Sequence, residues 1–539
     1  MFNSHIFTHK VGLLARLIAG IVIVASLALQ LHLAWRDSQT SDEGVHLVAG
    51  YTYLTRHDFR FNPEHPPLVK LLAGLPLIAM TIHEPNNFNT WWQAAGNFYS
   101  DSWEANRQYA EAFLYTAGNS PDVLLFWGRL GPIMLFGILL LAVYATARHF
   151  FNDTTALVAL AIVALNPTLI AHGHLITTDI AAALGTLLTL FALWRYLEKP
   201  SYRQAIWLGL ALGLALVSKF TLIILVPITL FGIIYTRWKN RSLTFQQLAW
   251  HLVIISLIAY TLILLAYTPN WHAPPLPSDG NQTSTSIFHP FLIPADYFKG
   301  LSLVIQHAQI GHSSYLFGQY SNTGWWYYFP VVIALKTPLV VLIGFFVVIG
   351  HTIFRRKLDF STFCVVSALL ILAVAMTSKA NLGVRHVLPI FPLLSIALAA
   401  MIQKHTWVIS GVIITLFFEV LLSFPHYLPY ISPVLGGVNN GPFLVSDSNV
   451  DWGQDLKAIR DYMQTHDLGQ PYIDYSWAGA VSLDYWGLSR RPLERLASDK
   501  TGYLILSTAA IQNKAFNWLK DHPTFDRITP SVWVYKLDE

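Results

Sequence analysis

The chain has 539 residues, of which 54% are hydrophobic and only 12% are charged. A mean hydropathy above zero at this length excludes a soluble protein built around ordinary cores and predicts a polytopic membrane protein. The net charge of +4 is small, and the basic residues stand in short clusters between apolar runs. That pattern indicates membrane topology and argues against nucleic-acid binding.

The first apolar run, Val11 to Trp35, is longer than the apolar region of a secretory signal and has no small-residue cleavage site before the acids that follow. We expect it to be an uncleaved transmembrane helix. Residues 36–120 mix polar and aromatic side chains, which predicts a long, partly folded loop on one membrane face.

Ten further apolar runs follow, so the sequence predicts about eleven transmembrane helices. They lie at about Pro121–Ala147, Thr154–Ala171, Asp179–Leu197, Tyr202–Ser218, Phe220–Thr236, Leu248–Tyr267, Phe329–Phe354, Ser361–Thr377, Val384–Ile402 and Thr406–Phe424. Only Ser218-Lys219 separates the fifth run from the sixth, and one kinked helix there would invert the topology downstream.

Charge counting favours two helices at that point. Alternation from an inside N-terminus places the short basic loops inside, as the positive-inside rule requires. Those loops hold Arg148, Arg195, Arg237, Arg355 and Lys404. The same alternation places the loop 36–120 and the C-terminal tail outside, which in a bacterial cell means the outer face of the cytoplasmic membrane.

Residues 425–539 have a soluble composition and predict a small α/β domain outside the membrane, following a transmembrane domain of residues 1–424. We expect an amphipathic helix from Asp451 to roughly Thr465, and strands at Tyr472–Trp477, Tyr503–Ser507 and Val532–Lys536. Aromatic residues of this tail either form its core or stack on sugar faces. They include Trp452, Trp477, Tyr485 and Trp486.

Acidic residues follow the first helix closely. Asp42 and Glu43 stand a few residues beyond it, where solvated acids are common, and Glu64-His65 precede two prolines that fix the direction of the backbone. An acid pair beside a bilayer suits a general base, a metal ligand or an ion-coupling group. The alternative for Glu64-His65 is an ordinary helix start with proline in its first turn.

A second polar cluster lies in a predicted outer turn. Asp179 opens an apolar helix, where a carboxylate is costly unless it meets a cavity or a partner. The neighbouring histidines are usually interfacial hydrogen-bonding groups, and their spacing is a weak metal pattern. A divalent metal is therefore only compatible with the sequence, and its candidate ligands are Asp42, Glu64, His65, His172 and His174.

Three cations are predicted on the same outer face: Lys219, Lys379 and Arg385. Lysine and arginine are usually enriched in the loops on the inner face, so cations on the outer face are unusual. They suit a lipid phosphate, whose charge must be met while another group acts as a base, although a basic side chain also extends to ordinary headgroups.

Together these motifs resemble the bacterial polyprenyl-phosphate-dependent glycosyltransferases of the C-type membrane fold (GT-C). That superfamily holds the protein O-mannosyltransferases and the lipid A aminoarabinose transferases. The resemblance covers roughly Val11 to Phe424. It rests on the acid pair, Glu64-His65-Pro66-Pro67-Leu68, Asp179, Ser218-Lys219-Phe220 and Val384-Arg385-His386-Val387-Leu388-Pro389.

The resemblance implies inverting transfer of a hexosyl or pentosyl group from a polyprenyl phosphate to a lipid, glycan or protein. It assigns the base to Asp42, with Glu43 as its neighbour and second candidate. Glu64 matches the acid of the family's Glu-x-Pro-Pro motif, but the next position, often lysine in the aminoarabinose transferases, is His65 here. We expect His65, Asp179, Lys219, Lys379 and Arg385 to bind substrate.

A transporter or flippase of a lipid-linked substrate, coupled to ions, is the alternative function. Such a protein is expected to have internal repeats and charges near the middle of the bilayer. We find no defensible repeat, and the unusual groups gather at one end of the predicted helices. The sequence therefore favours the enzyme.

Overall fold

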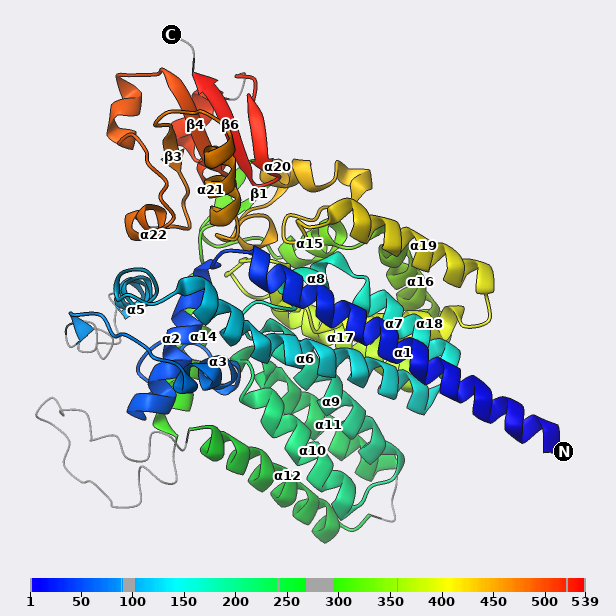
Figure 1. The fold of residues 1–539 in the computed structure, drawn as a ribbon. Coiled ribbons are helices and arrows are strands. Elements are labelled where there is room, and N and C mark those ends of the chain that lie inside the picture. Colours follow the sequence, from blue (N-terminus) through cyan, green and yellow to red (C-terminus); the bar gives the residue numbers. More distant parts are fainter. Residues whose placement is uncertain are drawn as a thin grey trace, which may run out of the picture.

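The computed structural model describes residues 2–88, 90, 102–239, 243–267, 294–355, 357–519 and 522–537. Figure 1 shows a bundle of long helices with a small sheet beyond one end, and the N-terminus at the opposite end. The helices of the bundle are α1 (Phe2–Arg36), α6 (Pro121–Phe150), α7 (Asp153–Ala164), α8 (Pro167–His172), α9 (Asp179–Glu198), α10 (Tyr202–Leu216), η3 (Phe220–Ile224), α11 (Leu225–Lys239), α12 (Phe245–Ala266), α15 (Tyr328–Lys336), α16 (Leu339–Arg355), α17 (Phe360–Ala375), η5 (Val384–Val387), α18 (Ile390–Ile402) and α19 (Thr406–Ser423).

The protein is a multi-pass α-helical membrane protein, as predicted, and every apolar run of the sequence is helical. In the described part of the chain, six helical segments are long and apolar enough to cross a membrane, compared with the eleven expected, and a seventh is added if α16 and α17, bent by 113°, are taken as one span. Other apolar runs form helices that are shorter, such as α7 and α18. Leucine and isoleucine side chains of α1 are exposed, whereas α9 is buried along most of its length. Exposed apolar faces are what lipid covers.

Two of the expected single helices are broken, and proline is the reason. Asn166 precedes Pro167 and adopts an extended conformation, so the run 154–171 divides into α7 and α8, with the Asn166 side chain capping α8. Thr337 precedes Pro338 and is likewise extended, which separates α15 from α16. The break at Ser218-Lys219 is present as predicted, between α10 and η3.

Short helices occupy the described parts of the segment 36–120, as expected. They are α2 (Ser41–Arg56), α3 (Leu68–Gly74), η1 (Leu75–Ala79), α5 (Ser102–Glu111) and η2 (Ala112–Thr116). Helices α2 and α3 cross at two glycines, because a Cβ atom on Gly50 would lie 1.8 Å from the Lys70 carbonyl oxygen and one on Gly74 would lie 2.4 Å from the Gly50 carbonyl carbon. This close approach packs the Glu64 loop, which leads into α3, against α2.

Helix α14 (Ala295–Ile310) and the hairpin of β1 (Ser314–Leu316) and β2 (Gln319–Ser321) lie between the bundle helices α12 and α15 in the sequence. The described part of the segment between α12 and α15 is therefore folded. Residues 268–293 of this segment lie outside the described part of the chain.

The tail contains a four-stranded sheet of order β3-β4-β6-β5, in which only β3 and β4 are parallel. Its elements are η6 (Pro433–Leu435), η7 (Val438–Asn440), α20 (Gly441–Leu444), η8 (Asp447–Asn449), α21 (Leu456–Thr465), β3 (Tyr472–Asp474), α22 (Ala480–Tyr485), η9 (Leu493–Ala497), β4 (Gly502–Ser507), α23 (Thr508–Gln512), η10 (Lys514–Leu519), β5 (Asp526–Thr529) and β6 (Val532–Leu537). Alternating residues of β4 and β6 enter two separate cores, so both faces of the sheet are covered.

The three predicted strands are present, and β5 is an additional, largely exposed edge strand. The predicted amphipathic helix begins at Leu456 and not at Asp451. Gly453, with a φ of +108°, interrupts it, and the carbonyl groups of Trp452 and Gln454 accept hydrogen bonds from Ser41 and Ser38. The division of the chain at residue 424 stays a prediction.

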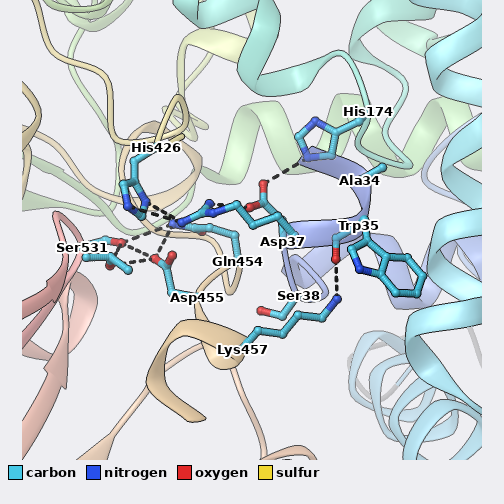
Figure 2. A network of polar contacts seen from close by, with 12 residues as sticks. Ala34, Trp35, Asp37, Ser38, His174, His426, Gln454, Asp455, Lys457 and Ser531 are labelled. Atoms are coloured by element: carbon cyan, nitrogen blue, oxygen red, sulfur yellow. Dashed lines mark hydrogen bonds and ion pairs between the residues drawn. The ribbon is translucent and has the colours of Figure 1, made fainter. Parts of the chain in front are cut away.

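A polar network joins the end of α1 to the tail (Figure 2). Ser38 donates its hydroxyl to the Gly453 carbonyl at 2.8 Å and accepts the Leu456 N–H at 2.9 Å, while Lys457 donates to the Trp35 carbonyl at 2.8 Å. The Asp455 carboxylate accepts hydrogen bonds from Thr529 and Ser531 of the sheet. The tail is therefore attached directly to the segment that leads into α2.

A buried ion pair attaches the segment between α1 and α2 to helix α6 of the bundle. Arg129 of α6 donates to both Glu43 carboxylate oxygens, at 2.8 and 2.6 Å, and to the carbonyl groups of Ala34, Asp37 and Ser38. The two side chains are 1% and 0% exposed. Burial raises the pKa of Glu43, but Arg129 and backbone N–H groups outweigh burial and hold it below its ordinary value.

We expect the substitution Arg129→Met to destabilise the protein by about 3–5 kcal/mol, because it leaves a buried carboxylate without its cation. Thermal unfolding of the purified protein in detergent measures the change. The matched control is Arg490→Gln, whose partner Asp484 is 71% exposed. It should change stability by about 0.5 kcal/mol at most. Equal unfolding temperatures for the two variants would contradict this role of Arg129.

Candidate functional site

Asp42 lies in the first turn of α2, where the helix dipole favours an acid. Its carboxylate pairs with Arg385 at 2.9 Å, although the two residues are 343 positions apart in the sequence. The Asp42 and Arg385 side chains are 15% and 9% exposed. The pair is thus partly open, in contrast to the closed pair of Arg129 and Glu43.

Arg385 stands in η5, a single 3₁₀ turn between α17 and α18. Burial disfavours its charge, but the carboxylates of Asp42, Asp179 and Asp447 outweigh burial and raise the pKa of Arg385 above its ordinary value. Its guanidinium group also lies 4.2 Å from the ring centroid of Trp452. Arg385 is therefore a fixed positive charge surrounded by acids.

Asp179 and Lys219 form a second pair beside the first. The Lys219 Nζ atom donates to Asp179 Oδ1 at 2.5 Å, and the side chains are 5% and 1% exposed. Arg385 is close enough to Asp179 to interact with its charge. The predicted substrate-binding residues Asp179, Lys219 and Arg385 are therefore brought together with Asp42.

Several buried polar atoms of this region have no hydrogen-bond partner within the described ranges. They include Asp179 Oδ2, Arg385 Nε and His386 Nε2. Buried polar atoms in native proteins are nearly always hydrogen-bonded to protein, water or ligand. The unpaired atoms therefore favour a polar ligand or ordered water at this place.

Glu64 and His65 approach the pair from the loop before α3. Burial and the negative charge of Asp42 raise the pKa of Glu64 above its ordinary value. The ring of His65 meets that of His46 edge to face, at 5.0 Å between centroids, and burial lowers the pKa of His65. His46 donates from Nδ1 to the Ile176 carbonyl at 2.6 Å, and burial lowers its pKa to about 4, so both imidazoles are neutral at neutral pH.

Lys70 fixes the loop that carries Glu64. Its fully buried ammonium group donates to the Tyr53 hydroxyl at 2.9 Å and to the carbonyl and side-chain oxygens of Asn62. Asn62 has a positive φ of 47°, a conformation that asparagine tolerates better than most residues. The side chains that follow, Glu64 and His65, are thereby directed toward α2.

Two of the predicted residues are placed differently from the rest. Glu43 is completely buried, and its two oxygens accept hydrogen bonds from Arg129, Thr40 N–H and Ile176 N–H. Its contacts are those of a packing residue. Lys379 is exposed, and its backbone N–H donates to Ala308 of α14, so it marks the edge of the site.

The candidate metal ligands do not converge. His174 bonds to Asp37 at 3.2 Å and to Gln30 at 3.2 Å, within the network of Figure 2. His172 packs against Trp452, with ring centroids 6.4 Å apart. Among the residues that the structure describes, no group of three or more histidines, cysteines or acids is arranged to hold a metal ion.

The sequence analysis assigned no role in this site to three residues that contribute to it, His46, His386 and Asp447. It also did not predict that Trp452 contacts Arg385. His386 is part of the motif that contains Arg385, and Asp447 and Trp452 belong to the tail segment 446–455. That segment carries many polar residues in a short span, which is the one signal that pointed to it. Trp452 is 1% exposed and cannot stack on a sugar.

The arrangement offers a carboxylate at a partly open position, with a fixed cation beside it. Such a carboxylate can accept a proton from a hydroxyl group, and such a cation can bind a phosphate oxygen. The neighbouring pair of Lys219 and Asp179 has no net charge, and it adds an ammonium group to the guanidinium group of Arg385.

Comparisons with known proteins match part of the sequence to a family and the course of the chain to solved structures. A family model described as dolichyl-phosphate-mannose-protein mannosyltransferase matches residues 122–266. That segment holds Asp179 and Lys219, and it ends before Arg385. A comparison with curated proteins finds no match.

Solved structures with a similar course of the chain include ArnT from Cupriavidus metallidurans bound to undecaprenyl phosphate, at 12% identity, with 96% of this chain and 97% of that chain covered and a TM-score of 0.47. The oligosaccharyltransferase AglB from Archaeoglobus fulgidus, with an inhibitory peptide and a dolichol-phosphate, has 11% identity, 91% and 69% coverage and a TM-score of 0.44. The Saccharomyces cerevisiae protein O-mannosyltransferase Pmt1-Pmt2 complex, bound to the sugar donor, has 18% identity, 47% and 33% coverage and a TM-score of 0.34.

The match over residues 122–266 confirms the resemblance drawn from the sequence motifs. Over residues 122–266 the chain is thus similar to a family of membrane glycosyltransferases with a polyprenyl-phosphate-linked donor, in agreement with the resemblance to the GT-C enzymes.

Proposed function

We propose that this protein transfers a sugar from a polyprenyl phosphate to a hydroxyl group of a lipid, glycan or protein acceptor, with Asp42 as the general base. The observation that carries the proposal is the partly exposed pair of Asp42 and Arg385, at 2.9 Å, beside the pair of Asp179 and Lys219. A base and phosphate-binding cations are the two requirements of this reaction, and here they are neighbours.

The proposed step is a single displacement. Asp42 accepts the proton of the acceptor hydroxyl as its oxygen attacks the anomeric carbon, and the bond from that carbon to the phosphate oxygen breaks. The polyprenyl phosphate leaves with the bonding electron pair, and attack from the opposite side inverts the anomeric centre. Positive groups fixed near the departing oxygen stabilise the charge that develops there.

Arg385 is the residue we propose to bind the leaving phosphate. Its Nη1 atom donates to Asp42, while its buried Nε atom has no partner in the described part of the chain. A guanidinium group has five N–H donors, so it can contact a phosphate oxygen and keep its contact with Asp42. Lys219 and the exposed Lys379 supplement the positive charge.

Glu64 and His65 are proposed to contact the sugar or the phosphate from the opposite element. The raised pKa of Glu64 favours its protonated form more than in water, and a protonated carboxyl group donates a hydrogen bond to a sugar hydroxyl or a phosphate. Neutral His65 is able to accept or donate one.

We propose the topology that the charge pattern predicts, with the N-terminus inside, the site and the tail outside, and the protein in the cytoplasmic membrane. The bundle supports one part of this topology. Gly12, near the start of α1, lies beside Arg148 and Asp153, so the N-terminal end of α1 and the basic loop after α6 are at the same end of the bundle, opposite to Arg129. The topology is tested by introducing single cysteines at exposed positions of the tail and labelling them in intact cells.

The transporter alternative is disfavoured by the family match over residues 122–266, because the matched family is one of transferases. The direct test is transfer of label from a panel of radiolabelled polyprenyl-phosphate sugars by the purified protein, with and without a chelator. Labelled product from at least one donor is expected. Inactivity on every donor, together with uptake or flipping of a lipid-linked substrate in vesicles, would favour the transporter.

Asp42→Asn should lower the transfer rate by about 10²- to 10⁴-fold, because the amide cannot accept the proton. The unfolding temperature should fall less than in Arg129→Met, since the amide oxygen still accepts a hydrogen bond from Arg385 and the carboxylates of Asp179 and Asp447 still interact with its charge. Single-turnover kinetics and thermal unfolding measure the two effects. Transfer at the wild-type rate would refute the assignment of the base.

Arg385→Lys should bind the donor more weakly than the wild type and Arg385→Gln more weakly still, because lysine keeps the charge but loses the planar fork. The donor KM and its dependence on salt are the measurements. Arg490→Gln, which removes an equal charge from an exposed pair of the tail, serves as the control and should leave the donor KM unchanged. Equal donor KM values for all three variants would contradict a phosphate contact.

Glu64→Gln should stabilise the protein at neutral pH while it lowers transfer. The folded-state pKa of Glu64 is raised, so its ionised form destabilises the folded protein above that pKa, and the penalty vanishes once both states are protonated, below about pH 4.5. The difference in unfolding temperature between variant and wild type should therefore grow as the pH rises through the range above 4.5. A difference that is constant with pH would show that Glu64 is not perturbed.

A further inference from the structure

One residue of the tail, Trp452, contacts both Arg385 and Ser41, the residue before Asp42. We propose that Trp452 is a positioning residue of the site, which holds the Arg385 guanidinium group against Asp42 and so couples the tail to catalysis. The inference rests on the proposed function for its kinetic consequence, and on geometry alone for the contact itself.

The ring side of the contact is a cation–π interaction. The guanidinium carbon of Arg385 lies 4.2 Å from the centroid of the Trp452 ring, and that ring is 1% exposed. Cation–π attraction is strongest for tryptophan and increases when water is excluded. The ring therefore restricts Arg385 to one orientation without using any of its N–H donors, which stay available to Asp42 and a phosphate.

The backbone side of the same residue fixes Asp42. The Trp452 carbonyl accepts the N–H of Ser41, the residue before Asp42, at 2.8 Å. The next residue, Gly453, has a φ of +108°, and a Cβ atom there would lie 2.9 Å from the Gln39 carbonyl. The tail thus packs directly against the start of α2 and contacts the residues on both sides of its N-cap, Thr40.

Neighbouring residues of the tail hold the turn that carries Arg385. Asn449 accepts the N–H of Val384 at 3.0 Å, and the Ser448 hydroxyl donates to the Leu382 carbonyl at 2.9 Å. Buried Lys336 of α15 donates to the Asn449 carbonyl at 2.6 Å. These bonds place Trp452 and Arg385 on a common support, so the stacking is a fixed feature of the fold.

The test compares Trp452→Phe and Trp452→Leu in transfer assays. Loss of the aromatic face should lower kcat/KM by about tenfold for Trp452→Leu, and phenylalanine should restore most of it. Trp533→Leu is the matched control, because Trp533 is a buried tail residue with Arg527 over its ring at the same 4.2 Å, away from Asp42. It should leave kcat/KM of the folded protein unchanged.

A double-mutant cycle separates positioning from general packing. In the Arg385→Gln background Trp452→Leu should cause no further loss of kcat/KM, since the cation is already absent. Tetrafluorotryptophan at position 452 keeps the shape of the ring and removes its negative face. It should therefore lower kcat/KM as Trp452→Leu does, and it replaces that variant if Trp452→Leu does not fold. Equal losses in both backgrounds, or full activity with the fluorinated residue, would overturn the inference.

A second measurement does not depend on transfer. Phenylglyoxal modifies arginine side chains, and peptide mass spectrometry locates the modified position. Arg385 should react several-fold faster in Trp452→Leu than in the wild type or in Trp533→Leu, and an unchanged rate would overturn the contact. If the wild type transfers no sugar, the proposed function fails, while this rate still decides whether Trp452 restrains Arg385.

Discussion

The site depends on one constraint: two opposite charges from distant parts of the chain must be held together where water is scarce. Removing the Asp42 carboxylate and the Arg385 guanidinium group from water is costly, and their attraction offsets that cost only in a favourable geometry. The start of α2, the turn η5 and the tail residue Trp452 meet at this pair. The architecture around it is best understood as what keeps this geometry fixed.

Three of the ion pairs at this end of the bundle differ in exposure, and the difference indicates different roles. Arg129 with Glu43 is closed and has every oxygen occupied, so it ties α1, α2 and α6 together. Lys219 with Asp179 is nearly closed and keeps one carboxylate oxygen unpaired. Asp42 with Arg385 is the most open, which suits the pair that we propose to meet acceptor and phosphate.

The sequence was sufficient for features that depend on local pattern. Long apolar runs predicted the helices, alternation predicted three of the four tail strands, and the cost of a carboxylate in an apolar helix marked Asp179. Pro338 divided an expected helix although the apolar run continues across it. The sequence was insufficient where neighbours are distant: another helix begins late, after Gly453, where the flanking carbonyl groups accept hydrogen bonds from Ser38 and Ser41. Likewise, nothing local distinguishes Asp42, partly exposed beside Arg385, from Glu43, which is sealed against Arg129, because the difference lies in which far helix each faces.

The position of the lipid phosphate tests the central claim most directly. A cryo-EM map of the protein in a nanodisc with undecaprenyl phosphate would show it. The account predicts the phosphate within hydrogen-bonding distance of Arg385, with Asp42 on the side from which an acceptor hydroxyl approaches. A phosphate bound at the end of the bundle near Arg148, or one separated from Arg385 by folded protein, would contradict it.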